Sequence, residues 1–77
     1  MTCFLTLQQM QPGECGKIVE LDTDDRAILG KLMSLGIIPG ITITLLRLYP
    51  GIVVQAGFTK AALDRSFARF IYVLKPR

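Results

Sequence analysis

The residues of this sequence that could perform chemistry are few, and their spacing matches no catalytic pattern. There are two cysteines, Cys3 and Cys15, and no histidine. A cysteine nucleophile would therefore have no neutral-pH base nearby in the sequence. Asp24 and Asp25 could form a carboxylate pair, but they directly precede an apolar-periodic segment, where acidic residues cap helices. We predict that the protein is not an enzyme.

Metal and nucleotide sites are also not predicted. The cysteines do not form a C-x-x-C pair, and the plausible hard ligands Glu14, Glu20 and Asp22 follow no ligand motif. The segment 13–17 has glycines and a lysine but lacks the spacing of a phosphate-binding loop. We expect no metal and no cofactor. Two cysteines are too few for a disulfide framework, so we expect reduced thiols, with a Cys3–Cys15 pair left open.

The chain has 77 residues and is 51 % hydrophobic, which fits one small domain spanning residues 1–77. A domain of this size buries only about 60 % of its unfolded surface, so its core is thin and leaves little room for a deep pocket. The first residues lack the charged start and long apolar run of a signal peptide, and no apolar stretch is long enough to span a membrane. We expect a cytosolic protein that could still dock on a membrane protein.

The net charge of +3 is unevenly distributed. Three basic and five acidic residues occur through Leu46, whereas six basic residues and one acidic residue follow from Arg47 onward. Aromatic residues are interleaved with the basic ones in this second half: Lys60, Arg65, Arg69, Lys75 and Arg77 lie among Phe58, Phe67, Phe70 and Tyr72. Such interleaving is typical of nucleic-acid binding. The aromatic residues also alternate with the period of a strand, and no RNA-binding signature is present, so a core role is favoured.

A helix and its end organise the first half of the chain. Apolar residues recur with helical spacing between Asp24 and Leu35, at Ile28, Leu29, Leu32, Met33 and Leu35. Gly36 follows where a helix C-cap requires a left-handed residue, Ile37 is placed to fold back on the last turn, and Pro39 stops the helix. Gly30, in mid-helix, costs about 1 kcal/mol relative to alanine and indicates either close backbone approach or neutral drift.

The remainder reads as short strands separated by glycine or proline. Expected strands span 14–22, 41–48, 52–56 and 70–74, with a short strand or extended link at 58–63. We expect a tight turn at 49–52, a helical turn at 64–68 capped by Asp64, and a lead-in at 1–11 containing one helical turn. About five short strands with regular turn signals predict a mainly β protein, a small closed barrel.

The chain resembles the FeoA family, small cytosolic accessory proteins of bacterial ferrous-iron uptake. The central match is the segment 32–40, which follows the family pattern L-x-x-L-G-apolar-x-P-G. Further matches are Leu5-Thr6-Leu7, Pro12-Gly13-Glu14, Gly57-Phe58-Thr59, the run from Ala61 to Arg65, Ala68 and Ile71-Tyr72-Val73. The resemblance covers nearly the whole chain and keeps the order of its parts.

The resemblance implies an SH3-like barrel with one helix inserted after the first strand, and no catalytic residues. It also implies a partner, a FeoB-type inner-membrane ferrous-iron transporter with a GTPase domain. The chain would bind its cytosolic part, peripheral to the membrane, and modulate its assembly or its GTPase cycle. The turn at 49–51 is shorter than the polar hairpin loop of many relatives, which puts any partner contact through that loop in doubt.

Two alternative functions stay open. Similar SH3-like domains form part of some metal-dependent repressors, although no DNA-binding helix pair is present in this chain. A small nucleic-acid-binding module would use the basic and aromatic second half.

For docking on a partner we favour the helix end and its connector, Met33, Ile37, Ile38 and Pro39. Two consecutive isoleucines in a connector cannot easily both point inward, and an exposed apolar patch on a small protein indicates an interface. The same patch could serve self-association.

Overall fold

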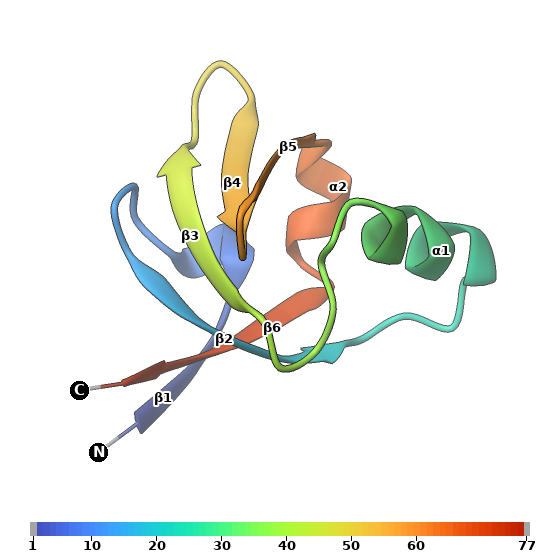
Figure 1. Cartoon of the computed structure of the whole chain (residues 1–77), viewed down its shortest axis with the longest axis horizontal. Helices are drawn as coiled ribbons and strands as arrows, with labels where there is room; N and C mark the ends of the chain where they lie inside the picture. The colour runs from blue at the N-terminus through green and yellow to red at the C-terminus, as the bar shows by residue number, and fades with distance from the viewer. Residues whose placement is uncertain (1, 77) are drawn as a thin grey trace.

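A computed structural model describes residues 2–76 of the chain and the side chains of residues 4–75. The elements are β1 (Thr2–Thr6), a 3-10 turn η1 (Leu7–Gln9), β2 (Cys15–Leu21), α1 (Arg26–Ser34), β3 (Thr42–Arg47), β4 (Ile52–Ala56), β5 (Thr59–Leu63), α2 (Arg65–Ala68) and β6 (Ile71–Pro76) (Figure 1). All six strands form one antiparallel sheet in the order β1-β6-β2-β3-β4-β5. The prediction of a mainly β domain is confirmed.

The structure corrects the prediction for the first residues. The expected lead-in contains the strand β1 before its helical turn η1, so there are six strands rather than about five. The helix α1 consequently follows the second strand, β2. This is the strand that we expected at 14–22 and took to be the first. β1 pairs with β6, and the register joins Phe4 to Leu74. A strand that pairs with the opposite end of the chain carries little local signal, because its partner is about 70 residues away.

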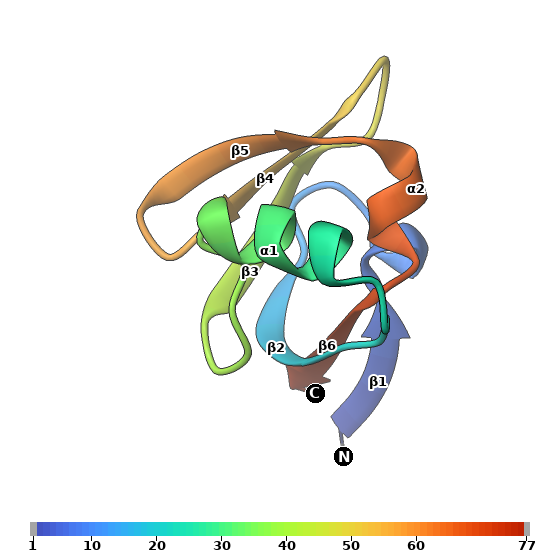
Figure 2. The same ribbon diagram turned by 90° about the vertical axis from the view of Figure 1, so that its right-hand side faces the viewer.

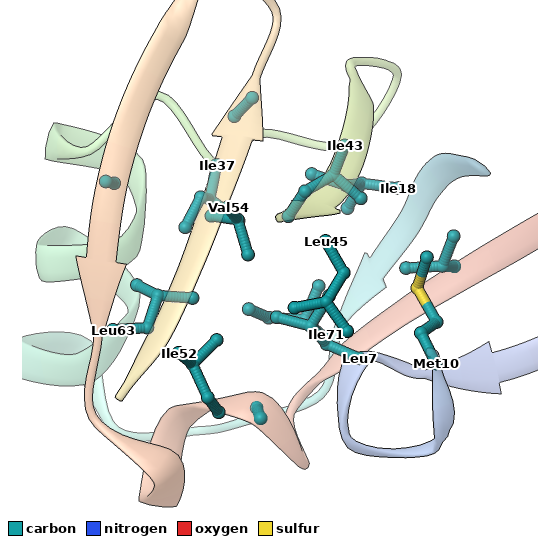
Figure 3. Close-up of a cluster of buried hydrophobic side chains, with 14 of the residues drawn as sticks. Leu7, Met10, Ile18, Ile37, Ile43, Leu45, Ile52, Val54, Leu63 and Ile71 are labelled. Atoms are coloured by element: carbon teal, nitrogen blue, oxygen red, sulfur yellow. The ribbon is translucent and has the colours of Figure 1, made fainter. Parts of the chain in front are cut away.

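The sheet curls around an apolar core. Its two edge strands do not pair with each other; on that side η1 contacts α2 and completes the enclosure (Figure 2). Burial alternates along β3 and β6, where Ile43, Leu45, Ile71 and Val73 are buried. Figure 3 shows many of the buried side chains converging between the strands. The buried hydrophobic residues are Leu7, Met10, Ile18, Leu32, Ile37, Ile43, Leu45, Ile52, Val54, Ala56, Ala61, Leu63, Ala68, Ile71 and Val73.

Close backbone approach occurs at Gly16 and not at Gly30. A Cβ atom added to Gly16 would lie 2.5 Å from Val73 Cγ1 and 2.8 Å from the carbonyl oxygen of Leu74, both on the neighbouring strand β6. A Cβ atom on Gly30 would meet nothing within 4 Å. The helical glycine therefore does not bring α1 closer to the sheet, and that half of our interpretation is wrong. The glycine of β2 is the one that allows two backbones to meet.

Candidate docking surface

The end of α1 has the geometry predicted from its sequence. Gly36 has a φ of +86°, and its N–H donates to the Met33 carbonyl at 3.0 Å. The Ile37 N–H donates to the Leu32 carbonyl, also at 3.0 Å. These two bonds are the pair that defines a Schellman cap. The turn from α1 into the connector is therefore held by backbone hydrogen bonds and a left-handed glycine.

The start of α1 is fixed by side-chain caps. Asp25 Oδ1 accepts hydrogen bonds from the backbone N–H of Ala27 at 2.9 Å and of Ile28 at 3.4 Å. The Thr23 hydroxyl oxygen accepts one from the Asp25 N–H at 3.1 Å. Asp25 thus acts as the helix N-cap, as the sequence indicated, and α1 is anchored at both ends.

The four residues predicted for docking do not share one environment. Met33 and Ile38 are exposed by 45 % and 43 %, and Pro39 is exposed as well. Ile37, in contrast, has no exposed surface and belongs to the core (Figure 3). The cause is the Schellman cap, which folds the residue after the glycine back onto the last helical turn, where Leu32 is also buried. Ile37 is therefore removed from the predicted docking residues, because its side chain cannot contact a partner.

Sequence reasoning missed the most exposed apolar side chain near this joint. Phe58 is fully solvent-exposed and occupies the two-residue turn between β4 and β5, whose flanking residues Ala56 and Thr59 pair with each other. A turn of only two residues projects beyond the ends of its strands, so the side chain of Phe58 points into solvent rather than into the core. The signal available in the sequence was Gly57, which breaks the strand immediately before Phe58 and has a φ of +61°.

The β4–β5 turn lies beside the end of α1 and its connector (Figure 2). The Gly57 N–H donates to the Thr42 carbonyl at 2.9 Å, which ties the turn to the start of β3. A Cβ atom on Gly36 would lie 3.9 Å from Thr59 Cβ, next to Phe58 in the sequence. We call the exposed apolar residues of these two segments, Met33, Ile38, Pro39 and Phe58, the joint surface.

The aromatic and basic residues of the second half largely interact within the chain. The guanidinium of Arg65 lies 4.4 Å from the centre of the Tyr49 ring, and its Nη2 donates to the Leu48 carbonyl at 3.1 Å. Arg69 lies 5.0 Å from the centre of the Phe70 ring. Phe67 packs against the core, as predicted. The core role is wrong for the fully exposed Phe58, and Tyr72, between the buried Ile71 and Val73 on β6, lies on the opposite face of the strand. Each of these cation–π pairs covers one face of its ring, on Tyr49 and on Phe70.

The acidic residues do not assemble into a ligand cluster. Among the residues that the structure describes, no group of three histidine, cysteine, aspartate or glutamate side chains could hold a metal ion. Glu14 is instead ion-paired with Lys75 across the sheet, and its Oε1 accepts a hydrogen bond from the Gln11 N–H at 2.7 Å. Glu20 and Asp22 are exposed on and just after β2.

The two cysteines are too far apart to pair within one chain. β6 lies between β1, which carries Cys3, and β2, which carries Cys15. Two strand spacings place the backbones about 10 Å apart, beyond the 4.4–6.8 Å between Cα atoms that a disulfide requires. Cys15 is a free, exposed cysteine, and the Cys3 side chain lies outside the described residues.

Within residues 2–76, neither helix has the length and apolar character needed to cross a membrane.

Comparison with known proteins identifies a matching family. The family model of the FeoA domain matches residues 5–75. Among curated proteins, no sequence matches the chain significantly.

Solved structures with the same fold include iron-uptake proteins and repressors. An iron uptake regulatory protein, FeoA, is 28 % identical with a TM-score of 0.83, and the match covers 92 % of this chain and 95 % of that one. FeoA of Stenotrophomonas maltophilia in complex with zinc, described as an SH3 domain protein, is 26 % identical with a TM-score of 0.73, over 92 % and 89 % of the two chains. IdeR of T. acidophilum has a TM-score of 0.88 at 19 % identity, over 96 % of this chain but 35 % of its own, and shows the fold alone. The expected SH3-like fold is confirmed.

Proposed function

The chain belongs to the FeoA domain family, whose members are non-enzymatic accessory domains of ferrous-iron transport, and from this premise we propose that it acts by binding a transporter. The partner is the cytosolic part of a FeoB-type inner-membrane ferrous-iron transporter, which carries a GTPase domain. Binding modulates the assembly of that transporter or its GTPase cycle. The observation that carries the proposal is the match of the family model over residues 5–75, nearly the whole chain.

The chemistry of the described residues supports a binding role. The chain has no histidine, and no cluster of ligating side chains is found in the described part of it. Its buried side chains are all hydrophobic there, so no polar group points into an enclosed site. Contacts at the surface are what such a domain can offer. The protein would work in the cytoplasm and reach the membrane only through its partner.

The joint surface is the docking site that we favour. Three large apolar side chains, Met33, Ile38 and Phe58, are exposed there, and exposed apolar clusters on small proteins commonly mark interfaces. The segments that carry them are held by the Schellman cap at Gly36 and by the backbone bond from Gly57 to Thr42. A surface held in place before binding loses little conformational entropy when the partner arrives. A FeoB-type cytosolic domain would cover it with an apolar surface of its own.

Binding measurements with charged variants test this assignment. We expect Ile38→Asp and Phe58→Asp to weaken binding of the purified chain to the cytosolic domain of a FeoB-type transporter by at least about tenfold. Placing a carboxylate against an apolar partner surface costs more than about 1.4 kcal/mol, which corresponds to tenfold. Binding is measured by calorimetry and GTP hydrolysis by phosphate release. Neither variant should change the melting temperature, since both side chains are exposed.

The matched control is Leu46→Asp. Leu46 is exposed by 39 %, close to the 43 % of Ile38, but lies on β3 away from the α1 connector. The Leu46→Asp variant should bind the transporter domain as tightly as the unmodified chain does. Equal loss in all three variants would reject the joint surface while keeping the partner. No binding of the unmodified chain at any accessible concentration would reject the partner.

A further inference from the structure

The outer edge of β1 carries none of the usual protection of an edge strand. β1 and β5 are the two strands at the edges of the sheet. β5 carries Lys60, whereas the β1 sequence Thr-Cys-Phe-Leu-Thr has no charged residue and no proline. Its pairing with β6 runs through five residues without a bulge, and Phe4 is 68 % exposed. Proteins usually protect sheet edges with charges, prolines or bulges, because an open edge can pair with another strand.

Hydrogen-bond directions show which backbone groups face the open edge. The Thr6 N–H donates to Gln9 Oε1 at 2.9 Å rather than to its β6 neighbour Tyr72. Thr6 is therefore at a position whose backbone groups point away from β6. Since directions repeat every second residue along a strand, the backbone groups of Phe4 and Thr2 also point outward. Thr2 lies opposite Pro76, which has no N–H to donate to β1. This agrees with a position at which the two strands exchange no hydrogen bonds.

We propose that β1 pairs with β1 of a second copy of this chain. The strands are antiparallel about a twofold axis through Cys3, so that Phe4 of each copy lies opposite Thr2 of the other. Four backbone hydrogen bonds then join the copies, two in each Phe4–Thr2 pair. This register uses the outward-facing backbone groups of Thr2 and Phe4. It stops before Thr6, whose N–H already donates to Gln9 Oε1. The six-stranded sheets would merge into one sheet of twelve strands.

A second copy fits this edge better than a charged segment would. Pairing β1 with itself places no charged residue opposite another, and the nearest basic residue on β6, Lys75, is neutralised by its ion pair with Glu14. Both views show the β1–β6 ribbon projecting from the body of the domain, so a copy can approach without meeting the helices (Figures 1 and 2). Closed twofold pairing is also the commonest form of self-association. The proposal is independent of any transporter, since β1 is at one edge of the sheet, whereas the β4–β5 turn that carries Phe58 adjoins the strand at the other edge.

Phe4→Pro is the variant that separates pairing from folding. The Phe4 N–H points away from β6, so its loss leaves the internal ladder intact, and proline is tolerated on edge strands in this orientation. In the dimer the variant removes two of the four bonds. At about 1 kcal/mol each, this raises the dimer dissociation constant by roughly 30-fold. Sedimentation velocity over a range of concentrations measures the dissociation constant, and circular dichroism checks the fold.

The matched control is Ala62→Pro on the other edge strand, β5. With Ala56 and Thr59 closing a two-residue turn, Ala62 falls at a position whose N–H points outward. This variant should dimerise like the unmodified chain. A monomeric unmodified chain, or a dimer that Phe4→Pro leaves unchanged, would overturn the proposal. Capture of an extended peptide by a monomeric chain would assign the edge to a different occupant and also overturn it.

Cross-linking through Cys3 tests the register itself. In the proposed pairing the two Cys3 residues face each other at a non-hydrogen-bonded position, where Cα atoms are about 4.5 Å apart, within disulfide range. In the Cys15→Ala variant, diamide should oxidise the Cys3 thiols of two copies to one intermolecular disulfide, and the diamide is itself reduced. The Cys3→Ala variant, which keeps Cys15, should form no such dimer. The reverse outcome would refute this register.

Discussion

Replacing Gly36 by alanine tests the mechanism that shapes the joint. Gly36 has a φ of +86°, in a region that residues with a Cβ rarely adopt. Its environment imposes no clash, since an added Cβ would lie 3.9 Å from Thr59, an ordinary contact. The cost is therefore backbone strain of about 1–2 kcal/mol, offset in part by the reduced freedom of the unfolded chain. We expect a net loss of about 1 kcal/mol.

Gly30→Ala provides the matched control because the same chemical change occurs six residues earlier, inside α1. Gly30 has open space at its Cβ position and a helical backbone. Alanine there should raise stability by about 0.5–1 kcal/mol. The two variants should thus move in opposite directions from the unmodified chain. For a domain of this size 1 kcal/mol corresponds to a change in melting temperature of about 4–8 °C.

Thermal unfolding followed by circular dichroism measures both variants. We expect Gly36→Ala to melt below the unmodified chain and Gly30→Ala above it. Gly36→Val should melt lower still, because a branched Cβ opposes a positive φ more strongly. A Gly36→Ala protein as stable as the unmodified chain would refute the role assigned to the left-handed cap.

Two further predictions concern stability. Asp25→Ala removes the oxygen that accepts the Ala27 and Ile28 N–H bonds. It should lower the free energy of unfolding by about 1 kcal/mol, measured by urea unfolding. Unchanged stability would mean that water caps α1 equally well. Gly16→Ala places a Cβ 2.5 Å from Val73 Cγ1 and 2.8 Å from the Leu74 carbonyl oxygen. We expect the free energy of unfolding to fall by about 1–3 kcal/mol, seen as a lower melting temperature. A gain in stability would show that β2 and β6 can separate without cost.

The local features of this protein could be predicted because their causes are local. The helix end depends on Gly36 and its immediate neighbours, and the cap at Asp25 depends on the next three residues. The strand alternation that buries Ile43 and Ile71 is likewise visible in consecutive residues. Each of these structures is closed by hydrogen bonds or side chains within a few positions of one another.

The docking residues could be predicted only in part. The sequence indicates an apolar cluster at the joint, and the cap that buries Ile37 is local, but the exposure of Met33 and Ile38 depends on what packs beside the connector. Phe58 joins the cluster because β4 and β5 bring residue 58 beside residues 36–41, and no periodicity in the sequence encodes that proximity.

The sequence by itself determined the helix, its two caps and the mainly β character, and its motif order indicated the FeoA family that the family model confirms. The tight turn expected at 49–52 is wrong: the connection is a bend, and Gly51 does not adopt the positive φ that such a turn requires. Only the tertiary structure decided that β1 is a strand, that it forms an open edge beside β6, and that Gly16 lies against that same strand. The physical reason is that sheet pairing joins residues distant in the chain. Which backbone groups remain free, and which side chains remain exposed, is settled only when those distant partners meet.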